Sequence, residues 1–314
     1  MNKEMKIRVP VRVKPGDTIG IVAPAGPFDR PTFFRGARII EDMGFRIFIP
    51  PGLFEKNRYL AGSDKHRVQF VNQLFADKSI DAIICARGGY GSMRILPLLD
   101  FDTIKNNPKI FIGFSDITIL LSVLFTHCNL VTFHGPVVTS LADASEETKL
   151  SLYRNLTTDS NLEIKLSGGR TIKPGVAAGE ICGGNLTMLC HLVGTPFAPD
   201  FKNKILFLED RGEAPYRIDR MLVHMDLAGC FNGISGIILG AFEECGPIED
   251  VIKIILEFFE KYPVPILAGF DAGHGSHNLT IPLGIKATLD ADRHSLIYHR
   301  AATTEGRGQR TEGR

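Results

Sequence analysis

Residues 109–133 read KIFIGFSDITILLSVLFTHCNLVTF, and this stretch decides the fold. It begins with the pattern of a buried strand, Lys109–Gly113, and continues into a helical pattern over Asp116–His127. A second apolar strand, Leu130–Phe133, follows at once. A strand, a helix and a strand in close succession predict a unit with parallel strands, because two parallel strands need a crossover connection of this kind.

The same alternation extends toward the N-terminus. The further strands and the helix predicted in this region are Thr18–Ala23, Phe45–Ile49, Ile80–Cys85 and the helix Ser63–Ala76. Alternating strands and helices favour a parallel, doubly wound α/β sheet. Active sites in such sheets lie beyond the carboxyl ends of the strands. We therefore expect a site at the turns after Ala23, Cys85 and Gly113.

The pattern changes after about residue 150, where polar, glycine and proline residues become more frequent. We place a domain boundary within 155–175 and expect an N-terminal α/β domain at 1–165 and a mixed α/β domain at 166–300. The segments predicted in the second half are the strands Ile205–Leu208, Gly236–Leu239 and Pro265–Ala268 and the helices Tyr216–Leu227 and Val251–Tyr262. Residues 301–314 contain no large apolar side chain, which predicts a disordered tail.

The composition narrows the class of protein. The chain has 314 residues, 36 Lys and Arg against 35 Asp and Glu, and 44% hydrophobic residues, which is enough for a folded core. A net charge of +1 provides no global field for binding nucleic acid or an anionic membrane. No apolar run reaches the about 20 residues that cross a bilayer, and the N-terminus lacks the apolar region of a secretory signal. The six cysteines are dispersed, so we expect reduced thiols in a cytoplasmic enzyme that acts on a small molecule.

The turn Gly113-Phe114-Ser115-Asp116 lies at the predicted strand-to-helix junction. A nucleophilic serine needs such a tight turn, which projects its hydroxyl and leaves the next backbone N–H groups free to face an oxyanion. Ser115 or Asp116 would equally well cap the following helix, as these residue types commonly do. The motif is G-x-S-D rather than G-x-S-x-G, so it does not define an α/β-hydrolase.

The segment Arg87-Gly88-Gly89-Tyr90-Gly91 follows the predicted strand that ends at Cys85. Closely spaced glycines expose backbone amides that can bind an anion or complete an oxyanion hole. Arg87 is suited to hold a substrate carboxylate through a bidentate contact. The segment is neither a P-loop nor a G-x-G-x-x-G motif, and an ordinary Gly-rich turn is the alternative interpretation.

Carboxylates follow the predicted strand Ile205–Leu208. Glu209 and Asp210 come directly after it, and Glu213 lies a few residues further on. A carboxylate at a strand end can orient a histidine and stabilise the imidazolium that forms in catalysis. Surface acidity or a helix N-cap would explain the same residues without catalysis.

The loop GFDAGHGSHNLTIP, residues 269–282, supplies His274 and His277. A histidine flanked by glycines is suited to act as a general base, although a structural role is open for each of the two. Their spacing comes with no third ligand, so no metal site is predicted. Cys85, a rival nucleophile, ends an apolar strand without a cationic neighbour in sequence and is expected to be a buried core thiol.

Together these motifs resemble the LD-carboxypeptidase family of serine peptidases, which comprises muramoyltetrapeptide carboxypeptidases and their microcin-immunity relatives. The matching stretches run in order from Lys14 to about Gly284: KPGDTIGIVAPAGP, ARGGYGSMRILPLLD, GFSDIT, FHGP, GEICGGNLTML, LFLEDRGEAPYRIDRML and GHGSHNLTIPLG. The resemblance implies an N-terminal flavodoxin-like or amidotransferase-like α/β domain and a smaller, β-rich C-terminal domain, with the active site between them. It also implies a homodimer that needs no cofactor.

The resemblance assigns a Ser-His-Glu triad to this chain. Ser115 is the expected nucleophile, His274 the base and Glu209 the orienting carboxylate, with Glu213 as the reserve candidate for the third role. His277 falls at a position without an expected catalytic role.

The resemblance also implies how the substrate is held. The oxyanion hole is expected from the amides of Asp116 and of one glycine in the Gly88-Gly89 pair, here Gly89. Arg87 and Gly88 are expected at the substrate, with Arg87 on its terminal carboxylate. The implied reaction removes the terminal D-Ala from the murein tetrapeptide L-Ala-D-Glu-mDAP-D-Ala in cytoplasmic peptidoglycan recycling.

Two alternative functions stay open. A microcin-type hydrolase of the same family would cleave a peptidyl-nucleotide with the same triad, and it would be expected to need an aromatic platform for the base. The absence of Trp argues against that reading, although Phe or Tyr could replace it. The second alternative is a non-catalytic protein that binds murein fragments. The sequence also leaves open whether the diamino acid is diaminopimelate or lysine.

Overall fold

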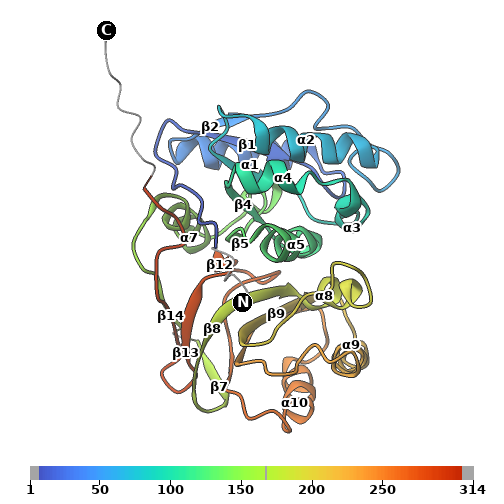
Figure 1. Ribbon diagram of the computed structural model, residues 1–314, viewed down its shortest axis with the longest axis vertical. Helices are drawn as coiled ribbons and strands as arrows, with labels where there is room; N and C mark the ends of the chain where they lie inside the picture. The colour runs from blue at the N-terminus through green and yellow to red at the C-terminus, as the bar shows by residue number, and fades with distance from the viewer. Residues whose placement is uncertain (1–6, 167, 306–314) are drawn as a thin grey trace, which may run out of the picture.

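Two β-sheets, one above the other in Figure 1, organise the chain. The computed structural model describes residues 7–166 and 168–305. Within these ranges, no helix is both long enough and apolar enough to cross a membrane. Each sheet has its own set of helices, and helix α5 (Thr118–Cys128) lies where the two halves meet (Figure 1).

The first sheet is built mainly from the N-terminal half. In spatial order its strands are β12 (Ile281–Leu283), β5 (Thr132–His134), β4 (Ile110–Gly113), β3 (Ala82–Cys85), β1 (Thr18–Val22) and β2 (Arg46–Phe48). All neighbours from β5 to β2 are parallel, and only β12 is antiparallel to its partner β5. The structure confirms the predicted parallel α/β sheet. Strands β3 and β4 are buried at every position, as expected of a sheet covered on both faces.

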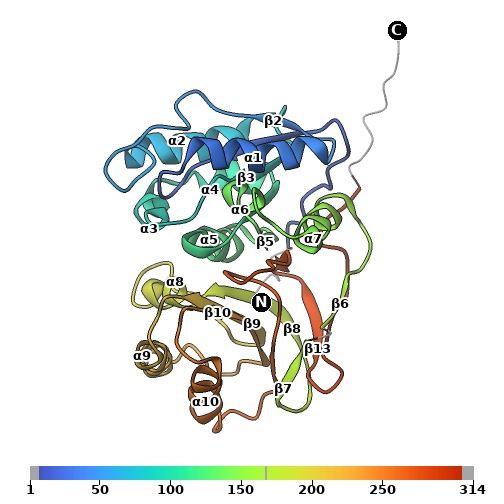
Figure 2. The same cartoon turned by 180° about the vertical axis from the view of Figure 1, so that it is seen from behind.

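The helices of this half are α1 (Arg30–Asp42), α2 (Asp64–Ala76), α3 (Ser92–Ile95), α4 (Phe101–Asn106), α5, α6 (Val138–Leu141) and α7 (Glu146–Thr157), with 3₁₀ turns η1 (Leu96–Leu98) and η2 (Ser115–Ile117). Helices α1 to α5 connect the parallel strands, and α6 and α7 follow the last of them. Helix α1 begins with Asp29 as its N-cap and has Pro31 in its first turn. Viewed from behind, α7 leads from this half down to the second sheet (Figure 2).

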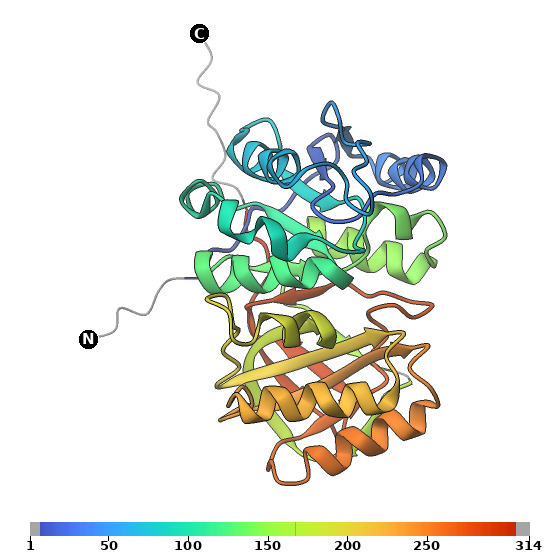
Figure 3. The same cartoon turned by 90° about the vertical axis from the view of Figure 1, so that its right-hand side faces the viewer.

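The second sheet is mixed. In spatial order its strands are β6 (Glu163–Lys165), β14 (Ser295–Tyr298), β13 (Lys286–Asp290), β8 (Val176–Asn185), β9 (Lys204–Arg211), β10 (Gly236–Glu243), β11 (Ile266–Ala268) and β7 (Arg170–Lys173). Strands β8 to β11 are parallel, and the outer pairs are antiparallel. Helices α8 (Leu186–Leu192), α9 (Pro215–Leu227) and α10 (Ile248–Phe258) belong to this half, and α9 and α10 cover its outer face (Figure 3). The second half is therefore mixed α/β and rich in strands.

The two faces of the second sheet belong to different cores. Along β9, Ile205 and Phe207 join the core of the first sheet, whereas Leu206 and Leu208 join a second core with α9 and α10. Successive side chains of a strand point to opposite faces. The next odd-numbered residue, Glu209, therefore faces the N-terminal half, and this alternation positions the site.

Two strands cross the boundary expected at 165/166. Strand β6, inside the predicted N-terminal domain, pairs with β14 in the second sheet. Strand β12 lies far into the C-terminal half but completes the first sheet through its pairing with β5. The two halves are therefore interleaved at the sheet edges rather than divided at a single position.

The folded chain also extends beyond residue 300. Ala302 and Thr303 are buried, and the backbone N–H of Thr304 donates to the carbonyl oxygen of Pro10 at 2.9 Å. Residues 301–305 thus pack against the N-terminal segment instead of starting the predicted tail. The remainder of that tail, residues 306–314, lies outside the described residues.

Candidate active site

The turns after β1, β3 and β4 meet at the carboxyl edge of the first sheet. The N–H of Gly26 donates to the carbonyl oxygen of Gly88 at 3.0 Å. A Cβ on Gly88 would lie 3.0 Å from the Cβ of Ser115 and 3.2 Å from its Oγ, so a side chain there would press on the serine. The structure brings together the three turns at which the strand pattern predicts a site.

Ser115 has a left-handed backbone, with φ 63°. Residues other than glycine rarely adopt this conformation, and such strain is concentrated at functional turns. Gly113 permits the turn, because a Cβ there would lie only 2.6 Å from Cγ2 of Ile117. The helix predicted from Asp116 accordingly starts with the 3₁₀ turn η2 and continues as α5.

Two buried polar side chains hold these turns together. The carboxylate of Asp116 accepts the backbone N–H of Ser92 at 2.9 Å and so ties the serine turn to the end of the glycine-rich loop. Arg67 donates to the carbonyl oxygens of Pro24 and, at 2.9 Å, of Gly91. Sequence reasoning missed Arg67; the available signal was a charged residue on the apolar face of α2.

The second half contributes a paired glutamate and histidine. Nδ1 of His274 lies 2.6 Å from Oε2 of Glu209, and the two side chains are 14% and 0% exposed. Gly273 is required beside this pair, because it has φ 106° and a Cβ on it would lie 2.6 Å from Oε2 of Glu209. The N–H of Gly273 donates to Oδ1 of Asn278 at 2.9 Å, which fixes the loop that carries the histidine.

The histidine lies next to the serine turn. The ring of Phe114, the residue before Ser115, is 4.9 Å from the ring of His274. When Nδ1 carries the proton and donates it to Glu209, Nε2 keeps its lone pair and can accept a proton from a hydroxyl. The arrangement is suited to activating a serine for attack on a carbonyl carbon.

The remaining candidates have other partners. Glu213 forms an ion pair with Arg217 at 3.4 Å, and Nδ1 of His277 contacts Oγ of Ser145 at 2.9 Å. Cys85 is fully buried, and burial raises the pKa of its thiol. Among residues 7–166 and 168–305, no three His, Cys, Asp or Glu side chains gather as a metal site would require.

A cavity of 300 Å³ opens beside His274. Phe114, Arg211, Ser276 and Asn278 are among its lining residues. Arg211 was not singled out from the sequence, although it lies two positions after Glu209 on β9 and therefore on the same face of the strand. The guanidinium of Arg87, by contrast, is exposed and donates to the carbonyl oxygen of Pro27 at 2.5 Å.

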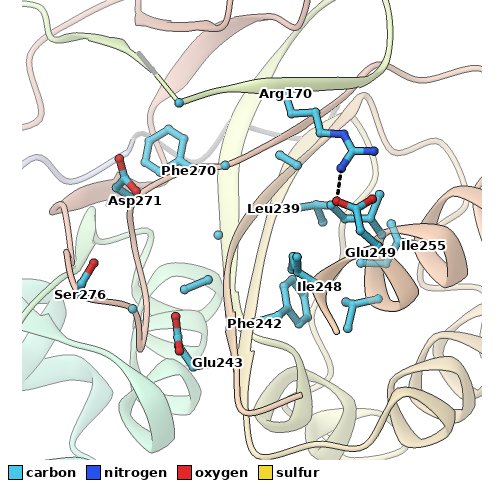
Figure 4. Close-up of a pocket in the computed structure, with 18 of the residues that line it drawn as sticks. Arg170, Leu239, Phe242, Glu243, Ile248, Glu249, Ile255, Phe270, Asp271 and Ser276 are labelled. Atoms are coloured by element: carbon cyan, nitrogen blue, oxygen red, sulfur yellow. Dashed lines mark hydrogen bonds and ion pairs between the residues drawn. The ribbon is translucent and has the colours of Figure 1, made fainter. Parts of the chain in front are cut away.

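A larger cavity of 510 Å³ lies next to the first one and shares Gly275 and Ser276 with it. Figure 4 shows the ion pair of Arg170 and Glu249 on one side of this cavity, with Ser276 of the histidine loop on the other. The ion pair Arg211–Glu244, at 2.5 Å, lies where the two cavities adjoin. Arg211 lines the smaller cavity and Glu244 lines the larger one.

The fold and the site define a two-domain α/β protein in which a Glu–His pair from one half lies beside the strained turn that carries Ser115 in the other. The chain belongs to the LD-carboxypeptidase family: residues 19–135 match its N-terminal domain and residues 178–289 its C-terminal domain. This confirms the resemblance inferred from the motifs.

Individual relatives span nearly the whole chain. It is 36% identical over 307 residues to the "Probable murein peptide carboxypeptidase" of Bacillus subtilis, covering 95% of this chain and 96% of the relative. It is 30% identical over 318 residues to the microcin C7 self-immunity protein MccF of Escherichia coli, covering 90% and 92%. The crystal structure of muramoyltetrapeptide carboxypeptidase from Oxalobacter formigenes has a TM-score of 0.82 at 28% identity, covering 90% and 97%.

Proposed function

We propose that the protein is an LD-carboxypeptidase that removes the terminal D-Ala from the murein tetrapeptide in cytoplasmic peptidoglycan recycling. The observation that carries the proposal is the 2.6 Å contact between His274 and Glu209 beside the strained turn of Ser115. The B. subtilis and O. formigenes relatives, which are named for murein peptides, support the choice of substrate class.

The proposed mechanism is acyl transfer. His274, oriented by Glu209, takes the proton of Ser115, whose Oγ attacks the carbonyl carbon of the diamino acid. The amides of Asp116 and Gly89 stabilise the oxyanion. The C–N bond then breaks, and the protonated histidine returns its proton to the amine of the departing D-Ala. Water, activated by the same histidine, hydrolyses the acyl-enzyme.

A carboxypeptidase must also bind the free terminal carboxylate of its substrate. Arg211 lines the cavity beside His274 and is already oriented by Glu244, which makes it a second candidate next to Arg87. If Arg211→Ala raises KM for the tetrapeptide while Arg87→Ala leaves it unchanged, the assignment to Arg87 fails.

A second candidate function follows from the similarity to the microcin self-immunity protein. In that case an aminoacyl-nucleotide would be the substrate, and the tetrapeptide would remain intact. Both functions use the same serine, so they are distinguished by the product rather than by the triad.

A serine-reactive fluorophosphonate probe separates both enzymes from a non-catalytic binding protein. We expect covalent labelling at Ser115, located by mass spectrometry of the digested protein, and no labelling of Ser115→Ala. A folded wild-type protein that binds murein peptides but resists the probe would contradict the proposed function.

A further inference from the structure

Several buried polar atoms in the same region as the Glu–His pair lack a hydrogen-bond partner within the part of the chain that the structure describes. They are both ring nitrogens of His134, Oε1 of Glu209, Nδ2 of Asn278 and Oγ1 of Thr280. His134 and Glu209 are completely buried. Buried polar groups are nearly always hydrogen-bonded, because an unpaired one carries the full cost of desolvation. The set combines donors with acceptors, so an enclosed water could link its members.

Contacts place these groups around the glutamate. The ring of His134 lies 4.9 Å from the ring of Phe207, which is on the same face of β9 as Glu209. Asn278 accepts the N–H of Gly273, the glycine that packs against the carboxylate of Glu209. His134 and Asn278 are therefore both linked to Glu209 through one neighbour, Phe207 in the first case and Gly273 in the second.

His134 is also close to the serine turn. It is the partner of Gly113 in the pairing of β5 with β4. The ring of Phe114 is close to both histidines, 6.0 Å from the ring of His134 and 4.9 Å from that of His274. The titratable groups that act on His134 are Glu209 from β9 and His274 from the late loop.

The ring of His134 is neutral at physiological pH, because burial lowers its pKa to about 4. A neutral imidazole has one N–H donor and one acceptor. It can therefore donate to a carboxylate oxygen without adding a second positive charge beside the imidazolium that forms on His274.

We propose that His134 is a positioning residue for Glu209. Its ring supplies the hydrogen bond that Oε1 of Glu209 needs through one enclosed water, and so holds the carboxylate toward His274. The inference rests on the triad of the proposed function, but it adds a group that does not touch the substrate.

The test is the pH dependence of Ser115 labelling by a fluorophosphonate in the full-length protein. His134→Phe keeps an aromatic ring against Phe114 and Phe207 but removes both nitrogens. We expect labelling to slow by roughly tenfold, the effect of one lost hydrogen bond of about 1.4 kcal/mol. We also expect the midpoint of the pH profile to rise, because the charge of a carboxylate that has lost a donor is less stabilised and favours the imidazolium more strongly.

Two variants make the result specific. His134→Gln restores a donor and an acceptor and should move the midpoint back toward the wild-type value. Thr132→Val removes a buried hydroxyl from the same strand, one that donates to the carbonyl oxygen of Leu121, and should leave the midpoint unchanged. Labelling of His134→Phe within twofold of wild type, or a midpoint that stays or falls, would overturn the inference. Absence of labelling in wild type would instead overturn the proposed function.

Acid stability provides a second readout. The pKa of a histidine is about 6.5 in the unfolded chain and about 4 in the folded protein. Between these values the unfolded state binds more protons, so the wild-type protein loses stability as the pH falls from about 6.5 to about 4. His134→Phe lacks this component, and its melting temperature should fall less over the same range. Equal falls in the two proteins would show that His134 is not buried as a neutral ring and would overturn the inference.

Discussion

Three acidic residues lie at or just after the end of strand β9. The alternation of side chains between the two faces of the strand distinguishes between them. Glu209 faces the first sheet and contacts His274, whereas Asp210 faces α8 and bonds to Thr187. Glu213 lies beyond the strand, where it pairs with Arg217. This distinction was available from the sequence, because Phe207 and Glu209 are two positions apart in an apolar strand. The resemblance selected the same residue without that geometric reason.

The position of Glu209 on the inner face of β9 predicts that Glu209→Gln and Glu213→Gln have unequal effects on kcat. Glu209→Gln keeps the shape of the side chain but removes the charge that stabilises the imidazolium, so kcat should fall by roughly 10²–10⁴-fold. Glu213→Gln should change kcat by less than about threefold, because only an exposed ion pair is lost. Steady-state kinetics on both purified variants checks this. The reverse ordering would transfer the third role of the triad to Glu213.

At the scale of elements, one side chain connects the end of β8 to the start of α8. Asp210 accepts hydrogen bonds from Nδ2 of Asn185 at 2.8 Å and from N and Oγ1 of Thr187 at 2.9 and 2.7 Å. Burial raises the pKa of this carboxyl group, so its ionised form depends on these donors. Asn185 is also the N-cap of α8. The turn that follows Gly183 and Gly184 is therefore held by a buried acceptor.

Loss of the Asp210 carboxylate should lower the free energy of unfolding of the protein. Asp210→Asn replaces one accepting oxygen with an amide donor that faces other donors, and we expect a loss of about 1–3 kcal/mol in the free energy of unfolding. Urea unfolding followed by circular dichroism measures the loss. Asp219→Asn, a matched change at an exposed position of α9, should stay within about 0.5 kcal/mol of wild type. Equal effects of the two variants would contradict the structural role of Asp210.

The strands of the first sheet show which elements the sequence pattern predicts and which it misses. The alternation of apolar strands with helices predicted the first sheet, because successive parallel strands of this sheet are connected through helices. Strand β12 was not predicted. It has three residues, too few for a periodic signal, and its partner β5 lies about 150 positions earlier in the chain. Pairing over such a separation depends on the assembled fold rather than on local pattern.

At the scale of the whole molecule, the site exists only when both halves are folded together. Ser115 comes from the first sheet, and Glu209 and His274 come from the second half of the chain. The turns that carry the candidate catalytic residues could be predicted from the residue types at the ends of the strands. Arg67 and Arg211 could not be singled out in the same way, because their roles depend on neighbours from distant segments.

The measurement that tests the account most directly is incubation of the protein with L-Ala-γ-D-Glu-mDAP-D-Ala, followed by mass spectrometry of the peptide. We expect the wild-type protein to release one D-Ala and leave the tripeptide, while folded Ser115→Ala leaves the tetrapeptide intact. A tetrapeptide that stays intact with the wild-type protein, beside a cleaved aminoacyl-nucleotide analogue, would contradict the account and support the microcin-type function.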